Sequence, residues 1–180
     1  MSEEVTTGYA ITRARPHDLP ALSAIELAAA RMLDGQAPES ILADTTPIAD
    51  FETAQRNGLL WVALAGENPV GFAHIKQLEP RSAHLDELDV HPAHGRRGLG
   101  TQLVRAVCSW AQDAGLESIT LCTFRHILWN MPFYARLGFE VIPTGKLTDE
   151  LRRLVSDETR RGLDPLQRVV MRWRVVPPSI

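Results

Sequence analysis

The sequence of 180 residues predicts a single α/β domain, with a mixed, mostly antiparallel sheet, a central βαβ unit and helices on both faces. Three observations lead to this prediction. Between residues 59 and 90, three stretches alternate apolar and polar residues and are separated only by turns, which is typical of an antiparallel meander. A glycine-rich turn then opens a helical pattern, and another strand follows that helix. No repeat, low-complexity tract or linker divides the chain, so we expect residues 1–180 to form one domain.

The first part of the chain predicts one strand and two helices. Residues 9–15 (YAITRAR) are expected as a strand, and residues 15–33 (RPHDLPALSAIELAAARML) as a helix with Asp18 as its cap and Pro20 early in the helix. A second helix is expected over residues 46–58, between a Thr-Pro start and an Asn-Gly stop. The first helix has one apolar face, made by Leu22, Ile25, Ala29 and Met32.

The central part of the chain predicts three antiparallel strands followed by the βαβ unit. The strands are residues 59–65, 70–78 and 83–90, joined by the turns GENP and EPRS. The helix that follows ends at Gly115, and the next strand is residues 117–124. A strand, a helix and a strand in this order place the two strands in parallel with a right-handed crossover.

Composition and charge exclude several classes of function. The net charge of −3 and the pI near 6.1 give no general attraction to nucleic acid or to an anionic membrane. The acidic start MSEEVTTGYA does not resemble a signal peptide, and the apolar stretch LLWVALAG is too short to span a bilayer. The two cysteines, Cys108 and Cys122, are expected as buried apolar residues rather than a disulfide framework or nucleophiles. We therefore expect a cytoplasmic protein with no nucleic-acid or membrane partner.

The stretch HGRRGLG, residues 94–100, has the character of an anion site. A glycine turn at the start of a helix presents free backbone N–H groups and the positive end of the helix dipole. On these residues alone, a plain connection with solvated arginines is an equal alternative. Two nucleotide motifs are excluded, because position 103 is Leu103 rather than the third glycine of a dinucleotide fingerprint, and no Gly-Lys-Ser/Thr forms a P-loop.

Two longer stretches, LDELDVHPAHGRRGLGTQLV and WNMPFYARLGFEVI, resemble the GNAT superfamily of N-acetyltransferases, which use acetyl-CoA. The resemblance runs from the ITRARPHDLPALSAIE opening to about Ile142. It implies splayed parallel strands and a backbone cradle for the CoA pyrophosphate. Gly95 departs from the family pattern, which usually has Gln or Arg there, and Asn130 lies four residues before Tyr134 rather than the usual seven. Asn130 therefore has helix capping as its alternative role. The implied cofactor-binding residues are Leu88, Val90, Gly95, Arg96, Arg97, Gly98, Leu99, Gly100, Thr101 and Asn130.

Glu87 and Tyr134 are the candidate catalytic residues. An alkylammonium acceptor must lose a proton before it attacks a thioester, and Glu87 is the expected base, acting directly or through water. Strand alternation places Glu87 on one face with Leu85 and Asp89. A backbone N–H near Leu88 to Val90 is the expected oxyanion donor, and Tyr134 is the expected acid for the leaving thiolate. The alternatives are an ion-paired or exposed Glu87 and a Tyr134 that only packs in the core.

Weaker expectations concern the acceptor side. Glu26, His74 and His84 are candidates for lining the acceptor pocket, with structural roles as the alternative. An inserted helix over about residues 147–162, before a last strand at 167–176, is expected to cover the pocket, an edge or a dimer interface, and the protein is a possible homodimer. No spacing of His, Cys and carboxylates predicts a metal site.

Together these features predict an N-acetyltransferase that moves an acetyl group from acetyl-CoA to a primary amine, with a small molecule as the expected acceptor. Transfer to a protein N-terminus or lysine is an alternative. A non-catalytic acyl-CoA sensor would keep the glycine turn and need neither Glu87 nor Tyr134. A nucleotide-binding βαβ protein is the least consistent with the missing fingerprints.

Overall fold

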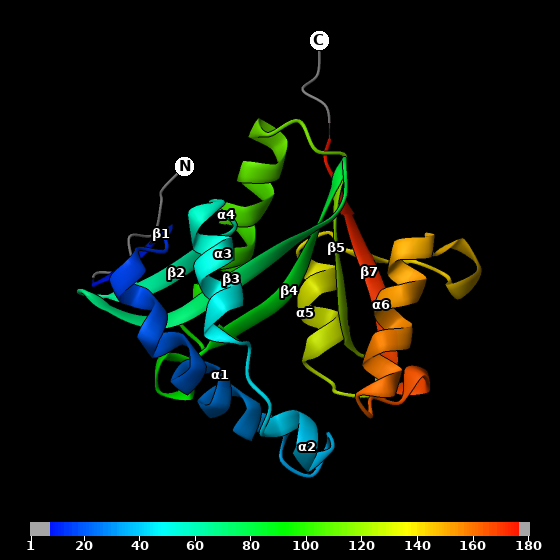
Figure 1. Ribbon diagram of the computed structural model, residues 1–180, viewed down its shortest axis with the longest axis horizontal. Coiled ribbons are helices and arrows are strands. Elements are labelled where there is room, and N and C mark those ends of the chain that lie inside the picture. Colours follow the sequence, from blue (N-terminus) through cyan, green and yellow to red (C-terminus); the bar gives the residue numbers. More distant parts are fainter. Residues whose placement is uncertain (1–7, 177–180) are drawn as a thin grey trace.

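The computed structural model describes residues 8–176, and a seven-stranded mixed sheet forms its centre (Figure 1). The strand order is β1-β2-β3-β4-β5-β7-β6. Neighbouring strands pair antiparallel except β4 and β5, which pair in parallel, so both the meander and the βαβ unit are confirmed. The strands are β1 (Tyr9–Arg13), β2 (Leu60–Ala65), β3 (Asn68–Glu79), β4 (Ser82–Val90), β5 (Ser118–Phe124), β6 (Glu140–Val141) and β7 (Arg168–Arg174).

Helices cover both faces of the sheet, as predicted. One buried cluster joins α4 to the sheet, and a second joins α1 and α3 to the opposite face of β2 and β3. The alternation of Trp61 and Ala63 with Leu60, Val62 and Leu64 in β2 supplies both clusters. The helices are α1 (Leu22–Ala30), α2 (Glu39–Leu42), α3 (Ile48–Arg56), α4 (Leu99–Asp113), α5 (Asn130–Arg136) and α6 (Asp149–Arg160). No helix within residues 8–176 is long and apolar enough to cross a membrane.

The expected single helix over residues 15–33 is divided into three. A 3₁₀ segment at Pro16–Ala21 precedes α1, and another at Arg31–Leu33 follows it. Asp18 does not cap α1, because its carboxylate accepts the backbone N–H of Arg15 at 2.7 Å and binds the Arg15 guanidinium. Pro20 inside the segment lacks the N–H that a continuous α-helix uses, which explains the tighter turn there.

Beyond their first four paired residues, β4 and β5 separate. They pair from Ser82 opposite Ser118 to Leu85 opposite Leu121 and no further. At that point the register between β3 and β4 shifts, so that Asp86 is an extra residue in β4. A β-bulge bends its strand and interrupts the ladder, which gives the splay that the family resemblance implied (Figure 1).

The same bulge corrects one prediction about β4. Leu85 does not share a face with Glu87 and Asp89, because it packs with Leu88 in the cluster under α4. The extra residue, Asp86, shifts the alternation by one position, so strict alternation across it was wrong for Leu85 and Asp86. Asp86 instead lies on the face of Glu87 and Asp89.

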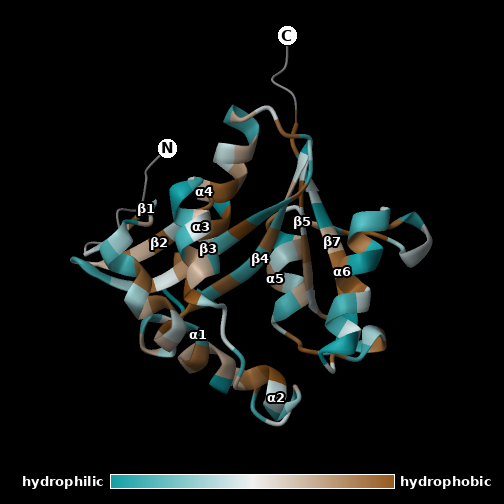
Figure 2. Ribbon diagram, viewed as in Figure 1, coloured by the Kyte–Doolittle hydropathy of each residue, from teal (hydrophilic) through white to brown (hydrophobic). Residues whose placement is uncertain are grey.

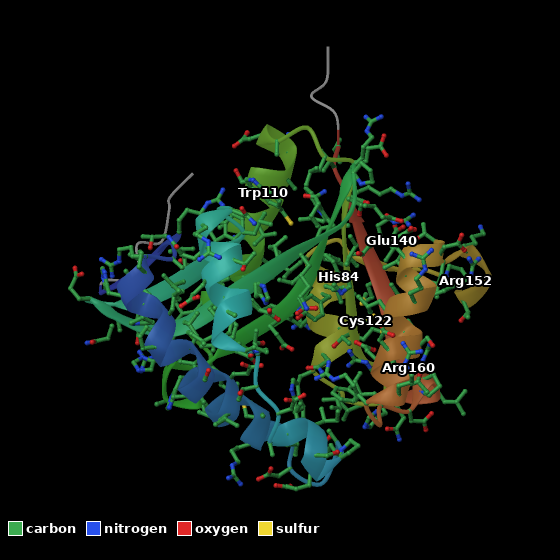
Figure 3. All side chains as sticks on the ribbon, in the orientation of Figure 1. His84, Trp110, Cys122, Glu140, Arg152 and Arg160 are labelled. Atoms are coloured by element: carbon green, nitrogen blue, oxygen red, sulfur yellow. The ribbon has the colours of Figure 1, made fainter. Side chains whose placement is uncertain are left out.

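The inserted helix is α6, with Thr148 as its N-cap, and it packs against the sheet through Leu151. Ion pairs three residues apart, such as Arg152 with Asp149, cover its outer face, as expected for a solvated helix. Much of α6 is coloured as hydrophilic in Figure 2, and Arg152 and Arg160 lie at the outer side of the molecule in Figure 3. The helix follows the short strand β6 and precedes β7, with which β6 pairs.

Candidate active site

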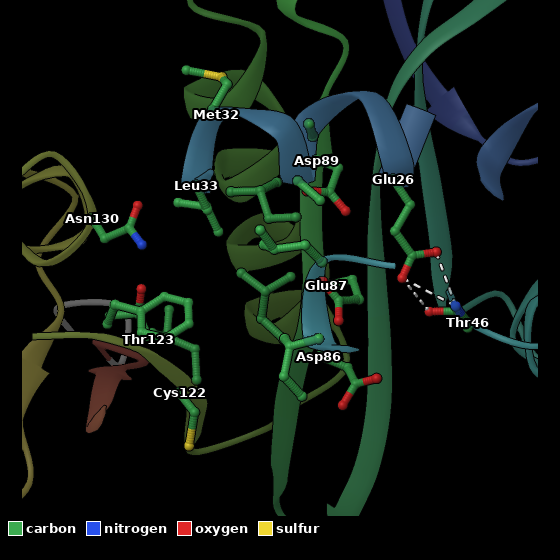
Figure 4. Close-up of a pocket in the computed structure, with 18 of the residues that line it drawn as sticks. Glu26, Met32, Leu33, Thr46, Asp86, Glu87, Asp89, Cys122, Thr123 and Asn130 are labelled. Atoms are coloured by element: carbon green, nitrogen blue, oxygen red, sulfur yellow. Dashed lines mark hydrogen bonds between the residues drawn. The ribbon is translucent and has the colours of Figure 1, made fainter. Parts of the chain in front are cut away.

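A cavity of about 940 Å³ opens where β4 and β5 separate. Its walls come from the second half of β4, the end of β5, the helices α1 and α5, and the segments that flank α2 and α6. Figure 4 shows Asp86, Glu87 and Asp89 along β4, Glu26 facing them from α1, and Asn130 on the other side of the space. The cavity thus lies at the centre of the sheet, between the two strands that separate.

The N-terminus of α4 is open for an anion. Gly98 is its N-cap in the left-handed conformation, with φ of 74° and no side-chain cap. The first bond of the helix runs from Gln102 N–H to the Gly98 carbonyl, at 3.0 Å. The N–H groups of Leu99, Gly100 and Thr101 therefore have no acceptor within the helix and carry its positive end.

The two arginines of the turn point to different places. Arg96 has a left-handed backbone, with φ of 57°, and lines the cavity together with Gly95. Arg97 does not line it, because its guanidinium lies over the ring of Tyr9 in β1, 5.8 Å from the ring centroid. The Tyr9 hydroxyl also forms a hydrogen bond with Nδ1 of His94 at 2.9 Å. Tyr9 of β1 therefore contacts two residues of the turn. A contact of Arg97 with a phosphate stays a prediction.

Three more predicted binding residues differ in how they reach the cavity. Leu99 has its side chain in the core, 1% exposed, so only its backbone can reach a ligand. Gly100 lines the cavity, and a Cβ placed there would lie 3.5 Å from the Phe133 ring. Asn130 also lines the cavity, and it is the first residue of α5 rather than its cap, which is Trp129. The capping alternative for Asn130 is therefore not observed.

Two backbone N–H groups of β4 face the splay. His91 N–H bonds to the carbonyl of Val70 in β3 at 2.8 Å. N–H groups alternate between the two edges of a strand, so those of Val90 and Leu88 point away from β3. Since β5 pairs no further than Leu85, these two groups open into the cavity, which both residues line.

Glu87 lies in the cavity wall without an ion-pair partner among residues 8–176. Burial raises the pKa of its carboxyl well above the usual value, and the carboxylates of Asp89, Asp86 and Glu26 raise it further, against a smaller effect of Arg168. The alternatives of a structural ion pair or a plainly solvated side chain do not describe this environment. A carboxylate with a raised pKa is a stronger base and is better suited to accept a proton.

Tyr134, in α5, lines the same cavity and also packs against the core, where its ring contacts Phe133 and Phe139. Burial raises the pKa of its phenol, and the nearby Asp89 and Glu87 carboxylates add to this. The phenol therefore remains protonated at neutral pH. Core packing and a proton-donating role are thus compatible in one side chain.

Of the three residues expected on the acceptor side, one lines the cavity and two do not. Glu26 lines the cavity and accepts the Thr46 N–H at 3.0 Å, so it also anchors the approach to α3 (Figure 4). His74 and His84 are buried and do not line the cavity. His84 bonds to the Thr120 hydroxyl at 2.9 Å, and burial lowers its pKa to about 4. For both histidines the structural alternative is correct.

Cys122 lines the cavity, which the sequence did not indicate, whereas Cys108 does not (Figure 3 labels Cys122 in the sheet). Both thiols are free, and burial raises the pKa of each to about 12. Neither is a thiolate at neutral pH, consistent with the expectation that neither is a nucleophile. Arg168, bonded to Glu158 at 2.8 Å, is a further cavity residue that sequence reasoning missed, because the pair joins β7 to α6.

Comparison with known proteins agrees with this geometry. A sequence model described as the Acetyltransferase (GNAT) family matches residues 24–139, more than half of the chain. The structure is similar to the PaiA N-acetyltransferase from Thermoplasma acidophilum in complex with coenzyme A, with a TM-score of 0.72, 18% identity, and coverage of 92% of this chain and 98% of that one.

Two further solved structures are similar to this chain. The ribosomal-protein-S18-alanine N-acetyltransferase from Escherichia coli has a TM-score of 0.66 and 18% identity over 95% of this chain and 96% of that one. The N-acetylglutamate synthase from Neisseria gonorrhoeae, complexed with coenzyme A and N-acetyl-glutamate, has a TM-score of 0.67 and 18% identity over 93% of this chain and 35% of that one. At these identities the structures show a shared fold, and the match of the family model to residues 24–139 shows that the chain is a member of the family. The chain belongs to the GNAT acetyltransferase family and is an acyltransferase enzyme.

Proposed function

We propose that this acetyltransferase moves the acetyl group of acetyl-CoA to the primary amine of a small molecule. The observation that carries the proposal is Glu87, a carboxylate with a raised pKa and no ion pair among residues 8–176, at the point where the sheet opens beside the free end of α4. A base in this place serves the deprotonation of an amine, and the helix end serves an anionic donor.

The described residues fit the pyrophosphate of acetyl-CoA. The N–H groups of Leu99, Gly100 and Thr101 offer donors, and Gly98 adopts a backbone that lets them converge. The absence of a side chain at Gly100 leaves room beside Phe133. Similar structures contain coenzyme A, which supports the same donor here.

Four groups then perform the transfer. Glu87 accepts a proton from the ammonium group of the acceptor, directly or through water, and so frees the nitrogen lone pair. Leu88 and Val90 N–H groups donate hydrogen bonds to the carbonyl oxygen of the thioester. As the new C–N bond forms and the C–S bond breaks, Tyr134 protonates the departing sulfur, and its phenolate recovers a proton, through water, when the nitrogen loses its second proton to become an amide. No covalent intermediate on the protein is needed.

Contacts between the two sides of the splay support a small acceptor rather than a protein. Leu33, Ala37 and Ile41 pack against Phe124, Ile127 and Leu163 from the opposite side of the splay in one apolar cluster. Two polar tethers reinforce this contact: His126 Nε2 bonds to the Gln36 carbonyl at 3.0 Å, and Arg161 pairs with Asp44 at 2.7 Å. Proteins of the same fold act on different acceptors, as the names of the two enzymes above show, so the fold alone does not choose among them.

The test combines binding and turnover. Calorimetric titration with acetyl-CoA, beside ATP and NAD, measures the donor, and a panel of primary amines is screened for release of free thiol. We expect Glu87→Gln to lower kcat by about a hundredfold or more while the Kd of acetyl-CoA is unchanged, because a positioned base contributes a factor of that order. Glu52→Gln, on the exposed outer side of α3, is the matched control and should retain wild-type turnover.

Two outcomes would contradict the proposal. Binding of acetyl-CoA without thiol release from any amine would favour an acyl-CoA sensor. Efficient acetylation of peptide N-termini or lysines, with no acetylation of small amines, would show that the acceptor is a protein.

A further inference from the structure

Asp89 is a cavity carboxylate for which the described protein provides no partner. It lies two residues after Glu87 in β4 and faces the same space (Figure 4). Its Oδ2 atom is buried and makes no hydrogen bond to any residue within 8–176. No ion pair involves Asp89 in that part of the chain.

The other acidic side chains at the same cavity are differently placed. Most of them have a nearby partner, which satisfies their oxygens within the protein: Asp86 pairs with Lys76 at 2.8 Å, Asp44 with Arg161 at 2.7 Å, Glu158 with Arg168 at 2.8 Å, and Glu26 with Thr46 at 3.0 Å. Asp50 is exposed to solvent, which screens its charge. Glu26 is buried and also has no cation, but its oxygens accept hydrogen bonds from Thr46. Glu87 and Asp89 are partly buried and have neither an ion pair nor a hydrogen-bond partner among the described residues.

Such a pair is expensive for the folded protein. A buried carboxylate without a counter-ion loses its hydration and receives nothing in return, and its neighbours here are other carboxylates. Burial and the charge of Glu26 accordingly raise the pKa of Asp89 to about 8. A cation brought by a ligand would relieve this cost, and the cavity gives it access.

We propose that Asp89 binds the ammonium group of the acceptor beside Glu87, so that the site selects acceptors that enter as cations. The inference rests on the proposed function in taking an amine as the acceptor, and it adds the residue that recognises the charge. Asp89 holds the ammonium group by a charge-assisted hydrogen bond, while Glu87 removes its proton. The two neighbouring carboxylates therefore have separate roles, one for binding and one for proton transfer.

The inference can be tested without knowing the natural acceptor. The complex with CoA is heated with increasing n-butylammonium chloride, with sodium chloride of the same concentration, or with n-butanol, which has a similar shape and no charge. A ligand that binds the native state raises Tm according to its Kd. The variants are Asp89→Asn, which keeps the shape and removes the charge, and the control Asp113→Asn, at the exposed end of α4, which changes the net charge equally.

We expect butylammonium to stabilise the wild type and Asp113→Asn, with an apparent Kd about tenfold or more weaker in Asp89→Asn, since hydrogen bonds to charged groups contribute at this level. Asp89→Asn should fold normally and show a higher Tm than the wild type at pH 8 in the absence of ligand. Equal stabilisation of wild type and Asp89→Asn by butylammonium, equal effects of butanol and butylammonium, or no effect of butylammonium on the wild type would each overturn the inference.

Kinetic measurements with a charged and an uncharged acceptor test this inference separately from the proposed function. Hydroxylamine is a nucleophile that is uncharged at neutral pH. Asp89→Asn should raise KM for an alkylamine acceptor and leave kcat/KM for hydroxylamine unchanged, whereas a loss with both would indicate a merely structural role. If no amine is acetylated while butylammonium still binds through Asp89, the proposed function fails and the cation site stands.

Discussion

At the scale of the single residue, Glu87 and Tyr134 show how position changes the chemistry of a side chain. Both are common residue types, and in both burial and neighbouring carboxylates raise the pKa. The raised pKa makes Glu87 a stronger base, and the raised pKa of Tyr134 keeps an acid protonated. Both groups thus favour their protonated forms, and in the proposed reaction Glu87 acts as the base once it is ionised.

The raised pKa of Glu87 predicts a distinct pH profile. The wild-type kcat/KM should rise with pH through the raised pKa of Glu87, above the usual glutamate range, because only the ionised carboxylate accepts a proton. Tyr134→Phe should retain this rise and lower kcat by about ten- to a hundredfold, since it removes the acid and leaves the base. Thiol release measured between pH 5 and pH 9 checks both statements. An unchanged kcat in Tyr134→Phe would restrict Tyr134 to packing, and an unchanged Tm shows that the ring still fills the core.

At the scale of the element, two glycines at the start of α4 have different requirements. Gly98 has φ of 74°, where a side chain is strained, whereas Gly100 lies within the helix and has ordinary space beside Phe133. Gly98→Ala should therefore lower the free energy of unfolding by about 1 kcal/mol or more. Gly100→Ala should raise it by up to about 1 kcal/mol, because alanine favours the helix, and yet weaken acetyl-CoA binding by filling the cavity side. Urea unfolding and calorimetry measure the two effects, and a Gly100→Ala protein that binds acetyl-CoA normally would remove Gly100 from the cradle.

The turn before α4 could be predicted from its residues, but the bulge in β4 could not. The residues HGRRGLG predict the turn without information from the rest of the chain, because glycines at a strand end indicate a turn and a helix start. The bulge at Asp86 depends on how β3 and β5 pair with β4, and strict alternation therefore misplaced Leu85. Glu87 and Asp89 were assigned to one face correctly, because they lie after the bulge.

Other differences have the same non-local origin. His74 and His84 lie in strands beside the cavity, yet His74 packs on Phe51 of α3 and His84 bonds to Thr120 of β5. The partners come from distant parts of the chain, so alternation within one strand gives no sign of them. The short helix α2 spans only Glu39–Leu42, too few residues for a helical period to be recognised.

At the scale of the whole molecule, the two halves of the sheet separate between β4 and β5, and residues from both halves line the cavity that forms there. The N-terminal helices and the meander supply Glu26, Glu87 and Asp89, and the C-terminal arm supplies Tyr134 and Arg168. Burying carboxylates in this cavity lowers the free energy of unfolding of the whole domain. Stability should consequently depend on pH in a way that reports the site.

Two opposing effects determine that dependence. His84, whose folded pKa is about 4 against 6.5 normally, is buried in its neutral form, so its contribution is lost as pH falls below 6.5. Asp89, with a folded pKa of about 8 against 3.8, behaves in the opposite way, because the native state retains a proton that the unfolded chain releases. Its contribution is complete below pH 3.8 and is lost as pH rises through 8. Glu87 is shifted in the same direction as Asp89.

The interval between pH 6.5 and pH 8 therefore isolates the carboxylates. We expect the free energy of unfolding in urea to fall by about 1 kcal/mol or more across this interval in the wild type, since one proton per pH unit corresponds to about 1.4 kcal/mol. Asp89→Asn should flatten the dependence, and Asp113→Asn should preserve it, because Asp113 is exposed at the far end of α4. If the wild type is equally stable at both pH values, Asp89 is not a buried carboxylate without a cation, and the charge recognition assigned to it loses its physical basis.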